Sequence, residues 1–116
     1  MKHAGQIVVT PFPYTDLTGA KLRPVLLLHE ASPRFDDWLV CMVSSQLQAE
    51  TGFDELISSD DADYGGTGLK APSVFRLSRL AVVDGSILLG AIGEISTARL
   101  VAIRQRLAAW VADVQE

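Results

Sequence analysis

Residues 23–29 read Arg-Pro-Val-Leu-Leu-Leu-His, and this stretch gives the clearest strand signal in the chain. Proline cannot donate to a strand ladder and is tolerated at the first residues of a strand, so Arg23-Pro24 marks its start. Proline also disfavours the helical region for the residue before it, so Arg23 should be extended. The apolar run Val25–Leu28 is far shorter than a membrane span. The stretch therefore predicts a short apolar strand that begins at Arg23.

Further β-like runs lie on both sides of this strand. Gln6–Thr10 forms the first, and prolines at 11 and 13 end it. A turn-rich loop then runs from Tyr14 to Lys21. Other strands are predicted at residues 37–45, 53–57, 73–83 and 86–92. Asp84-Gly85 separates the last two runs and is a strong signal for a hairpin turn.

The period of the apolar residues changes near the end of the chain. Steps of three and four relate Leu100, Ile103, Leu107, Trp110 or Val111, and Val114. This spacing predicts an amphipathic helix over about Thr97–Val114, with Ser96 or Thr97 as its N-cap. Several short strands followed by one helix predict a mainly β fold, a small antiparallel barrel with a C-terminal helix packed on it.

Length and composition fit one soluble globular domain over residues 1–116. Apolar residues make up 48% of the chain and charged residues 21%, which argues against disorder. The N-terminal residues contain no apolar signal-peptide core, and no run is long enough for a membrane span. Cys41 is the only cysteine, so an internal disulfide is excluded and a reducing cytoplasm suits the chain. Its apolar surroundings predict a small core residue rather than a nucleophile.

The distribution of charge matters more than the net charge of −4, which by itself argues mildly against a nucleic-acid partner. Between Gln46 and Leu69 there are six acids and no Lys or Arg: Glu50, Asp54, Glu55, Asp60, Asp61 and Asp63. The other eight acidic and ten basic residues give the remainder a net charge of +2. A local basic surface therefore remains possible, and we expect Asp60, Asp61 and Asp63 to act on an anionic ligand only through their long-range field.

Arginines and polar residues near strand ends are the candidate site residues. A guanidinium fixed at Arg23 suits phosphate recognition, although the dipeptide alone favours a surface arginine paired with a carboxylate. Ser44-Ser45-Gln46 leaves an apolar strand and could face a groove, but a solvated strand end is the simpler interpretation. Strict alternation puts Arg76 on one strand face with Ser78, and Arg79 on the other. Each arginine is either an edge residue or a site residue.

Several familiar catalytic and metal-binding patterns do not fit this sequence. The acidic run from Asp61 resembles the start of a calcium loop, but Pro72 stands where the bidentate glutamate is needed. The glycine-rich run at 65–70 lacks the Gly-Lys-Ser/Thr ending of a P-loop. His3 and His29 have no zinc-site spacing, and there is no nucleophile elbow. We expect no metal and no cofactor.

A series of modest motifs follows in order along nearly the whole chain. They are Gly5–Val8, Pro11–Asp16, Arg23–Leu26, Ser44–Gln46, Ser73–Leu77 through Val83-Asp84, and Leu89-Gly90 to Ile95. In their order and spacing they resemble the MazF/PemK-like toxins of type II toxin–antitoxin systems. The resemblance implies an SH3-like barrel, a homodimer and a cognate antitoxin protein as partner. It also implies a metal-independent cytoplasmic endoribonuclease that cuts single-stranded RNA.

The resemblance also implies roles for individual residues. The family's strand-start arginine corresponds to Arg23, its hydroxyl residue after the third strand to Ser44, and the later arginine of the PemK/Kid branch to Arg76. The two arginines would clamp a phosphate, and Ser44 would bond the phosphate or the 2′-OH. The RNA-binding residues implied are Phe12, Tyr14, Thr15, Lys21, Gln46 and Arg79. Phe12 or Tyr14 could stack on a base. We expect the cations to line one groove, with segment 50–63 at its rim or away from it.

Two positions depart from the family pattern. Ser78 stands where the PemK/Kid branch has an acidic residue two positions after the later arginine, and Gln6 stands where an acidic residue commonly follows the first glycine. No obvious general base is left, so a site built on Arg23 and Ser44 is the better hypothesis. The implied chemistry is attack of the RNA 2′-OH on the adjacent phosphate, which leaves a 2′,3′-cyclic phosphate.

Two other functions remain open. A topoisomerase-poisoning toxin of the CcdB type shares this fold, but that class ends in an exposed tail with a tryptophan. Trp110 lies within the helical pattern here, and six residues follow it. The other alternative is a catalytically silent barrel that only binds a partner, which Ser78 and the net acidity favour. Mapping cut ends on a long single-stranded RNA in EDTA separates these functions.

Overall fold

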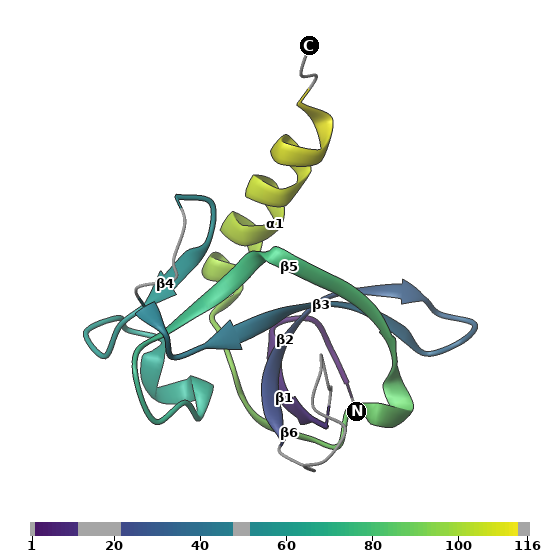
Figure 1. Cartoon of the computed structure of the whole chain (residues 1–116), viewed down its shortest axis with the longest axis horizontal. Coiled ribbons are helices and arrows are strands. Elements are labelled where there is room, and N and C mark those ends of the chain that lie inside the picture. Colours follow the sequence, from purple (N-terminus) through teal and green to yellow (C-terminus); the bar gives the residue numbers. More distant parts are fainter. Residues whose placement is uncertain (1, 12–21, 48–51, 114–116) are drawn as a thin grey trace.

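Within residues 2–11, 22–47 and 52–113, which the computed structural model describes, six strands form one sheet and one long helix follows them (Figure 1). The elements are β1 (Gln6–Thr10), β2 (Arg23–Ser32), β3 (Asp37–Ser44), β4 (Glu55–Ile57), β5 (Ser73–Asp84), β6 (Gly90–Glu94) and α1 (Thr97–Ala112). Every pair of neighbouring strands is antiparallel. The mainly β prediction with a C-terminal helix is confirmed.

The strands follow the order β4-β5-β3-β2-β1-β6, and the sheet curls into a half-barrel (Figure 1). β4 and β6 are its two edges, and they do not pair with each other. A short 3-10 turn, η2 (Tyr64–Thr67), follows β4 and packs against β6. The turn η2 therefore covers part of the exposed backbone of the edge strand β6.

The central strand β2 is buried on both of its faces. Leu26 and Leu28 lie in a first core and Val25 and Leu27 in a second, as alternation along a strand requires. The first core contains Ile7, Leu26, Leu28, Cys41, Ile57, Phe75, Leu77, Ile95, Ile103 and Leu107, and the second contains Val8, Val25, Leu27, Trp38, Val40, Val83 and Leu88. Helix α1 therefore covers one face of β2, and the curl of the sheet encloses the other.

Cys41 is fully buried in the first core, which confirms its predicted role as a core residue. Burial raises the pKa of its thiol, and the nearby Asp54 charge raises it further. A thiol kept protonated in this way is a poor nucleophile.

The predicted hairpin around Asp84-Gly85 is wrong. The Asp84 carboxylate accepts a hydrogen bond from Ser86 N at 2.8 Å and starts a 3-10 turn, η3 (Gly85–Ile87), in place of a tight hairpin turn. β6 begins at Gly90, later than predicted, and pairs with β1 rather than with β5. An aspartate that bonds the backbone two residues ahead is as typical of this turn as of a hairpin, so the local signal did not separate the two.

β5 contains a bulge where it runs beside β3. Cys41 pairs with Leu80, but the next residue, Met42, pairs with Arg76. Residues 77–79 therefore have no register partners on β3. A bulge of this kind bends a strand and leaves extra residues outside the ladder.

The bulge exchanges the two faces of β5. Phe75, before the bulge, and Leu77, at its start, lie in the first core; after it, Val83 lies in the second core and Ala81 packs against it. The uninterrupted alternation predicted for residues 73–83 is therefore wrong, and Arg79 lies exposed within the bulge.

Helix α1 confirms the predicted cap and part of the predicted apolar stripe. Ser96 is the N-cap, and its side chain accepts a hydrogen bond from Arg99 N at 3.1 Å. Ile103 and Leu107 are buried. Trp110 contacts the ring of Phe53 at 5.3 Å between centroids but stays 54% exposed. The end of the helix projects away from the sheet (Figure 1), so the stripe is buried only over its first turns.

The contact between η2 and β6 leaves no room for side chains at two glycines. Gly68 has φ +73°, and a Cβ on it would overlap the carbonyl of Ile92. A Cβ on Gly93 would overlap the carbonyls of Gly66 and Thr67. Glycine at these positions allows the two backbones to meet and complete the barrel.

We predict that Gly93→Ala destabilises the protein by about 1–3 kcal/mol, as overpacking of a tight contact typically does. Gly90→Ala is the matched control on the same strand, because nothing lies within 4 Å of its added Cβ. It should stay within about 0.5 kcal/mol of the parent. Urea unfolding of both variants measures this, and equal midpoints would contradict the close contact.

Candidate functional site

Three candidate residues lie at one end of three neighbouring strands. Arg23 begins β2 and Ser44 ends β3. The β2–β3 register ends at the pair of Val25 with Met42, and Arg23 and Ser44 each lie two residues beyond that pair on their own strands. On the other side of β3, Met42 pairs with Arg76 of β5. The sheet thus brings together residues that are 53 positions apart in the sequence.

The same three residues share one face of the sheet. Val25 and Met42 pack in and against the second core, and Arg23 and Ser44 alternate in step with them. Arg76 is the cross-strand partner of Met42, and such partners lie on the same face. Arg23, Ser44 and Arg76 therefore form one cluster, called here the candidate site, at the end of the second core.

The side chain of Arg23 is exposed and makes no hydrogen bond or ion pair with any residue that the structure describes. A carboxylate partner for Arg23, the simpler interpretation from the dipeptide, is therefore not seen in those ranges. Ser44 is half-buried, and its Oγ accepts a hydrogen bond from Gln46 N at 3.0 Å. An exposed guanidinium beside a hydroxyl is a suitable anion-binding pair.

Arg76 differs from Arg23, because a buried carboxylate contacts it. Its Nε lies 3.2 Å from Oδ2 of Asp54, whose side chain has no exposed surface. Oδ1 of Asp54 accepts hydrogen bonds from Ser78 N and Ser78 Oγ, both at 3.1 Å. Sequence reasoning missed Asp54, and the expectation that segment 50–63 stays at the rim or away is wrong for this residue. An acid within the weak strand predicted at 53–57 was the only signal available.

The acidic segment is also tied to helix α1. Arg99 makes a bidentate pair with Asp63, Nε to Oδ2 at 2.8 Å and Nη2 to Oδ1 at 3.0 Å. Its Nη1 donates to Glu55 at 2.7 Å, and Asp61 lies 3.4 Å away. Arg106 pairs with the other oxygen of Glu55 at 2.8 Å. We call this network the arginine clamp, and it engages Asp61 and Asp63 inside the protein.

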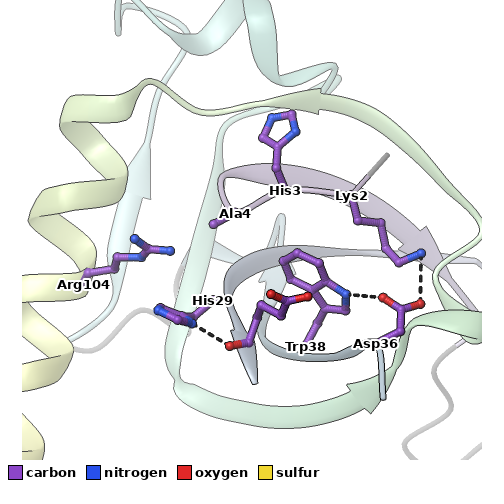
Figure 2. A pocket seen from close by; sticks show the side chains of 8 residues that line it. Lys2, His3, Ala4, His29, Asp36, Trp38 and Arg104 are labelled. Carbon is purple, nitrogen blue, oxygen red and sulfur yellow. Dashed lines mark hydrogen bonds and ion pairs between the residues drawn. The ribbon is translucent and has the colours of Figure 1, made fainter. Parts of the chain in front are cut away.

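A separate hollow of about 570 Å³ lies at the opposite end of β2 (Figure 2). Its lining residues are Lys2, His3, Ala4, His29, Glu30, Asp36, Trp38 and Arg104. Asp36 ties it together, accepting from Trp38 Nε1 at 2.8 Å and lying 3.4 Å from Lys2 Nζ. In the described ranges no three His, Cys, Asp or Glu side chains gather as metal ligands. The hollow contains none of the candidate-site residues.

The remaining predicted RNA-binding residues are placed only in part. Phe12, Tyr14, Thr15 and Lys21 lie outside the described residues. Gln46 is exposed just beyond β3, near Ser44, and Arg79 is exposed in the bulge of β5.

No helix in the described part of the chain combines the length and apolar character that crossing a membrane requires.

The arginine clamp predicts a loss of stability in acid. Hydrogen bonds from Arg99 hold the pKa of Asp63 well below its usual range. Because the folded pKa is lower than the unfolded value of about 3.9, this stabilisation is present above pH 4 and is lost as the pH falls further. Asp63→Asn should cost on the order of 1–3 kcal/mol at pH 7 and flatten the acid limb.

Urea unfolding between pH 2 and 7 measures this effect. The control is Asp60→Asn, which removes one charge from an exposed side chain of the same segment. If both variants follow the parent's pH dependence, the clamp does not contribute to stability.

Solved structures show the same fold at low sequence identity. The Mycobacterium tuberculosis toxin MazF-mt6 superposes with a TM-score of 0.66 at 18% identity, covering 94% of this chain and 99% of that one. A mycobacterial endoribonuclease in complex with its cognate antitoxin gives 0.66 at 18%, covering all of both chains. A MazE-MazF structure from Deinococcus radiodurans gives 0.68 at 19%, covering 97% of each chain. A comparison with curated protein sequences gave no significant match.

A family comparison covers nearly the whole chain. The model described as "PemK-like, MazF-like toxin of type II toxin-antitoxin system" matches residues 3–111. This range includes all six strands, the candidate site and helix α1 up to Val111. The chain therefore belongs to the PemK-like, MazF-like toxin family of type II toxin–antitoxin systems.

Proposed function

We propose that this protein is a metal-independent endoribonuclease that cuts single-stranded RNA and leaves a 2′,3′-cyclic phosphate. The observation that carries the proposal is the meeting of Arg23, Ser44 and Arg76 on one face, at one end, of three adjacent strands. Membership of the PemK-like, MazF-like toxin family supports it.

RNA supplies its own nucleophile in this reaction. The 2′-OH attacks the adjacent phosphorus, and the 5′ oxygen of the next nucleotide leaves. The protein has to hold the phosphate and stabilise the charge that develops on its oxygens. Arg23, which has no partner among the described residues, would contact that charge directly. Ser44 Oγ would bond a phosphate oxygen or the 2′-OH, and Arg76 would contact the phosphate from the neighbouring strand.

We also propose a cognate antitoxin as partner, a homodimer as the functional form and the cytoplasm as its place of action. Two of the similar solved structures are complexes with an antitoxin, the mycobacterial pair and the Deinococcus MazE-MazF pair. Large exposed apolar side chains such as Val82 and Leu89, 60% and 59% exposed, support a further protein interface.

A catalytically silent binding barrel is the second candidate, and the Asp54–Arg76 contact favours it. An arginine that is already neutralised by a buried carboxylate attracts a phosphate less than a free one does. Ser78 also offers no acidic group. Tight binding to an antitoxin with no cutting of RNA would identify this function.

The first functional prediction concerns the chemistry. Purified protein should cut a long single-stranded RNA in EDTA, because the proposed mechanism uses no metal. Replacing the 2′-OH at the cut site by hydrogen should abolish cutting, since the nucleophile is then missing. Continued cutting of the deoxy-substituted RNA would exclude the mechanism.

The second functional prediction concerns Arg23 and Ser44. Arg23→Ala should lower the cleavage rate on the order of 100-fold, as loss of one transition-state contact typically does. It should also reduce the salt slope of binding to an uncleavable RNA by roughly one unit. Ser44→Ala should lower the cleavage rate by a smaller factor than Arg23→Ala does.

Arg34→Ala is the matched control for this pair. Arg34 is an exposed arginine in the β2–β3 connection, at the other end of β2 from Arg23. Its replacement removes the same charge and should leave both rate and slope near the parent values. Equal slopes for the Arg23 and Arg34 variants would show that the RNA does not bind at the candidate site.

A further inference from the structure

The bulge of β5 directly follows the candidate-site residue Arg76, and its backbone needs hydrogen-bond partners from outside the β3–β5 ladder. Arg76 is the last residue before the bulge, and residues 77–79 have no register partners on β3. The N–H of Ser78 is therefore outside the β3–β5 ladder. Bulges are common beside active sites, where they redirect a side chain.

One carboxylate supplies this support. Asp54 directly precedes β4, and the register of Glu55 with Phe75 continues to place Asp54 opposite Arg76. Its Oδ1 accepts from both Ser78 N and Ser78 Oγ, and its Oδ2 contacts Arg76 Nε. Because Ser78 is one of the residues without a register partner on β3, these hydrogen bonds place the carboxylate at the gap in the ladder. The side chain of Asp54 thus accepts a hydrogen bond from the backbone N–H of Ser78 in the bulge and also contacts the guanidinium of Arg76.

The contact leaves the outer part of the guanidinium available. Asp54 binds Arg76 through Nε, and within the described ranges no hydrogen bond joins either Nη nitrogen of Arg76 to another residue. Arg76 keeps 17% of its side chain exposed, whereas Asp54 is fully covered. Because arginine carries five N–H donors in a rigid fork, holding one edge aims the opposite edge outward.

We propose that Asp54 is the positioning residue for Arg76, holding its guanidinium toward the scissile phosphate. This inference rests on the proposed cleavage of RNA and names the group that prepares one half of the phosphate clamp. Asp54 does not itself meet the substrate, because its side chain has no exposed surface and already accepts three hydrogen bonds. It acts through Arg76 by keeping that side chain in one orientation before RNA arrives.

The test compares Asp54→Asn with Asp60→Asn. Both changes remove one negative charge from the same segment, but only Asp54 contacts Arg76. Asp54→Asn should lower kcat by on the order of 10- to 100-fold, because a loosened group is misaligned in the transition state. The affinity for an uncleavable RNA should stay equal or rise, since Arg76 loses its counter-charge. Asp60→Asn should leave kcat unchanged.

A double-variant cycle separates positioning from a general structural effect. When Arg76 is already alanine, Asp54→Asn should lower kcat no further, because two residues that act as one unit are not additive. An equal loss of kcat with and without Arg76 would overturn the proposal, and so would parent-like kcat in Asp54→Asn. If the parent protein itself does not cut RNA, the proposed function fails instead, so the two failures are distinct.

A measurement on the parent protein covers the case in which Asp54→Asn does not fold. The Nε–H of Arg76 donates to a buried carboxylate, so its NMR signal should persist at neutral pH and exchange slowly with water. Arg76→Ala assigns the signal by its disappearance. Rapid exchange of the Arg76 Nε–H would contradict the positioning contact without any change at Asp54.

Discussion

Burial of β2 on both faces is the constraint on which the rest of the structure depends. Full burial of the four side chains of Val25–Leu28 contributes roughly 6–12 kcal/mol as an upper estimate, comparable with the whole net stability of a domain. Both faces therefore need a cover. Helix α1 provides one through Ile103 and Leu107, and the curl of the sheet provides the other. The ends of β2 stay open to solvent, and Arg23 lies at one of them.

The acidic segment acts mainly inside the protein. Asp54, Glu55, Asp61 and Asp63 all contact arginines, so most of the negative charge that argued against RNA is compensated locally. The compensation is reciprocal, however, because Arg76, Arg99 and Arg106 are engaged in the same contacts. The net charge of +2 counted for the remainder of the sequence thus overstates the positive charge that is free to meet a phosphate. Arg23 and Arg79 are exposed and take no part in these contacts.

Local signals in the sequence predict much of the fold, and the predictions that are wrong have a common cause. Pro24 marks the start of β2 and Ser96 caps α1, because each acts on backbone within a few residues of itself. Asp84-Gly85 was read as a hairpin, but its aspartate starts a 3-10 turn and the following strand pairs with β1. The alternation of residues in β5 likewise does not predict its bulge. Strand partners and register breaks depend on which chains meet in the sheet, and no local pattern contains that information.

By itself the sequence determined the mainly β class, the terminal helix and the buried Cys41. These follow from periodicity, from proline and from spacing, all of which are written along the chain. Only the tertiary structure decided that Asp54 would meet Arg76 across 22 residues and that Arg99 would reach Asp63 across 36. Such ion pairs join distant segments that the sheet and helix bring together. Charged side chains carry no directional pattern in the sequence, so their partners are chosen by folding alone.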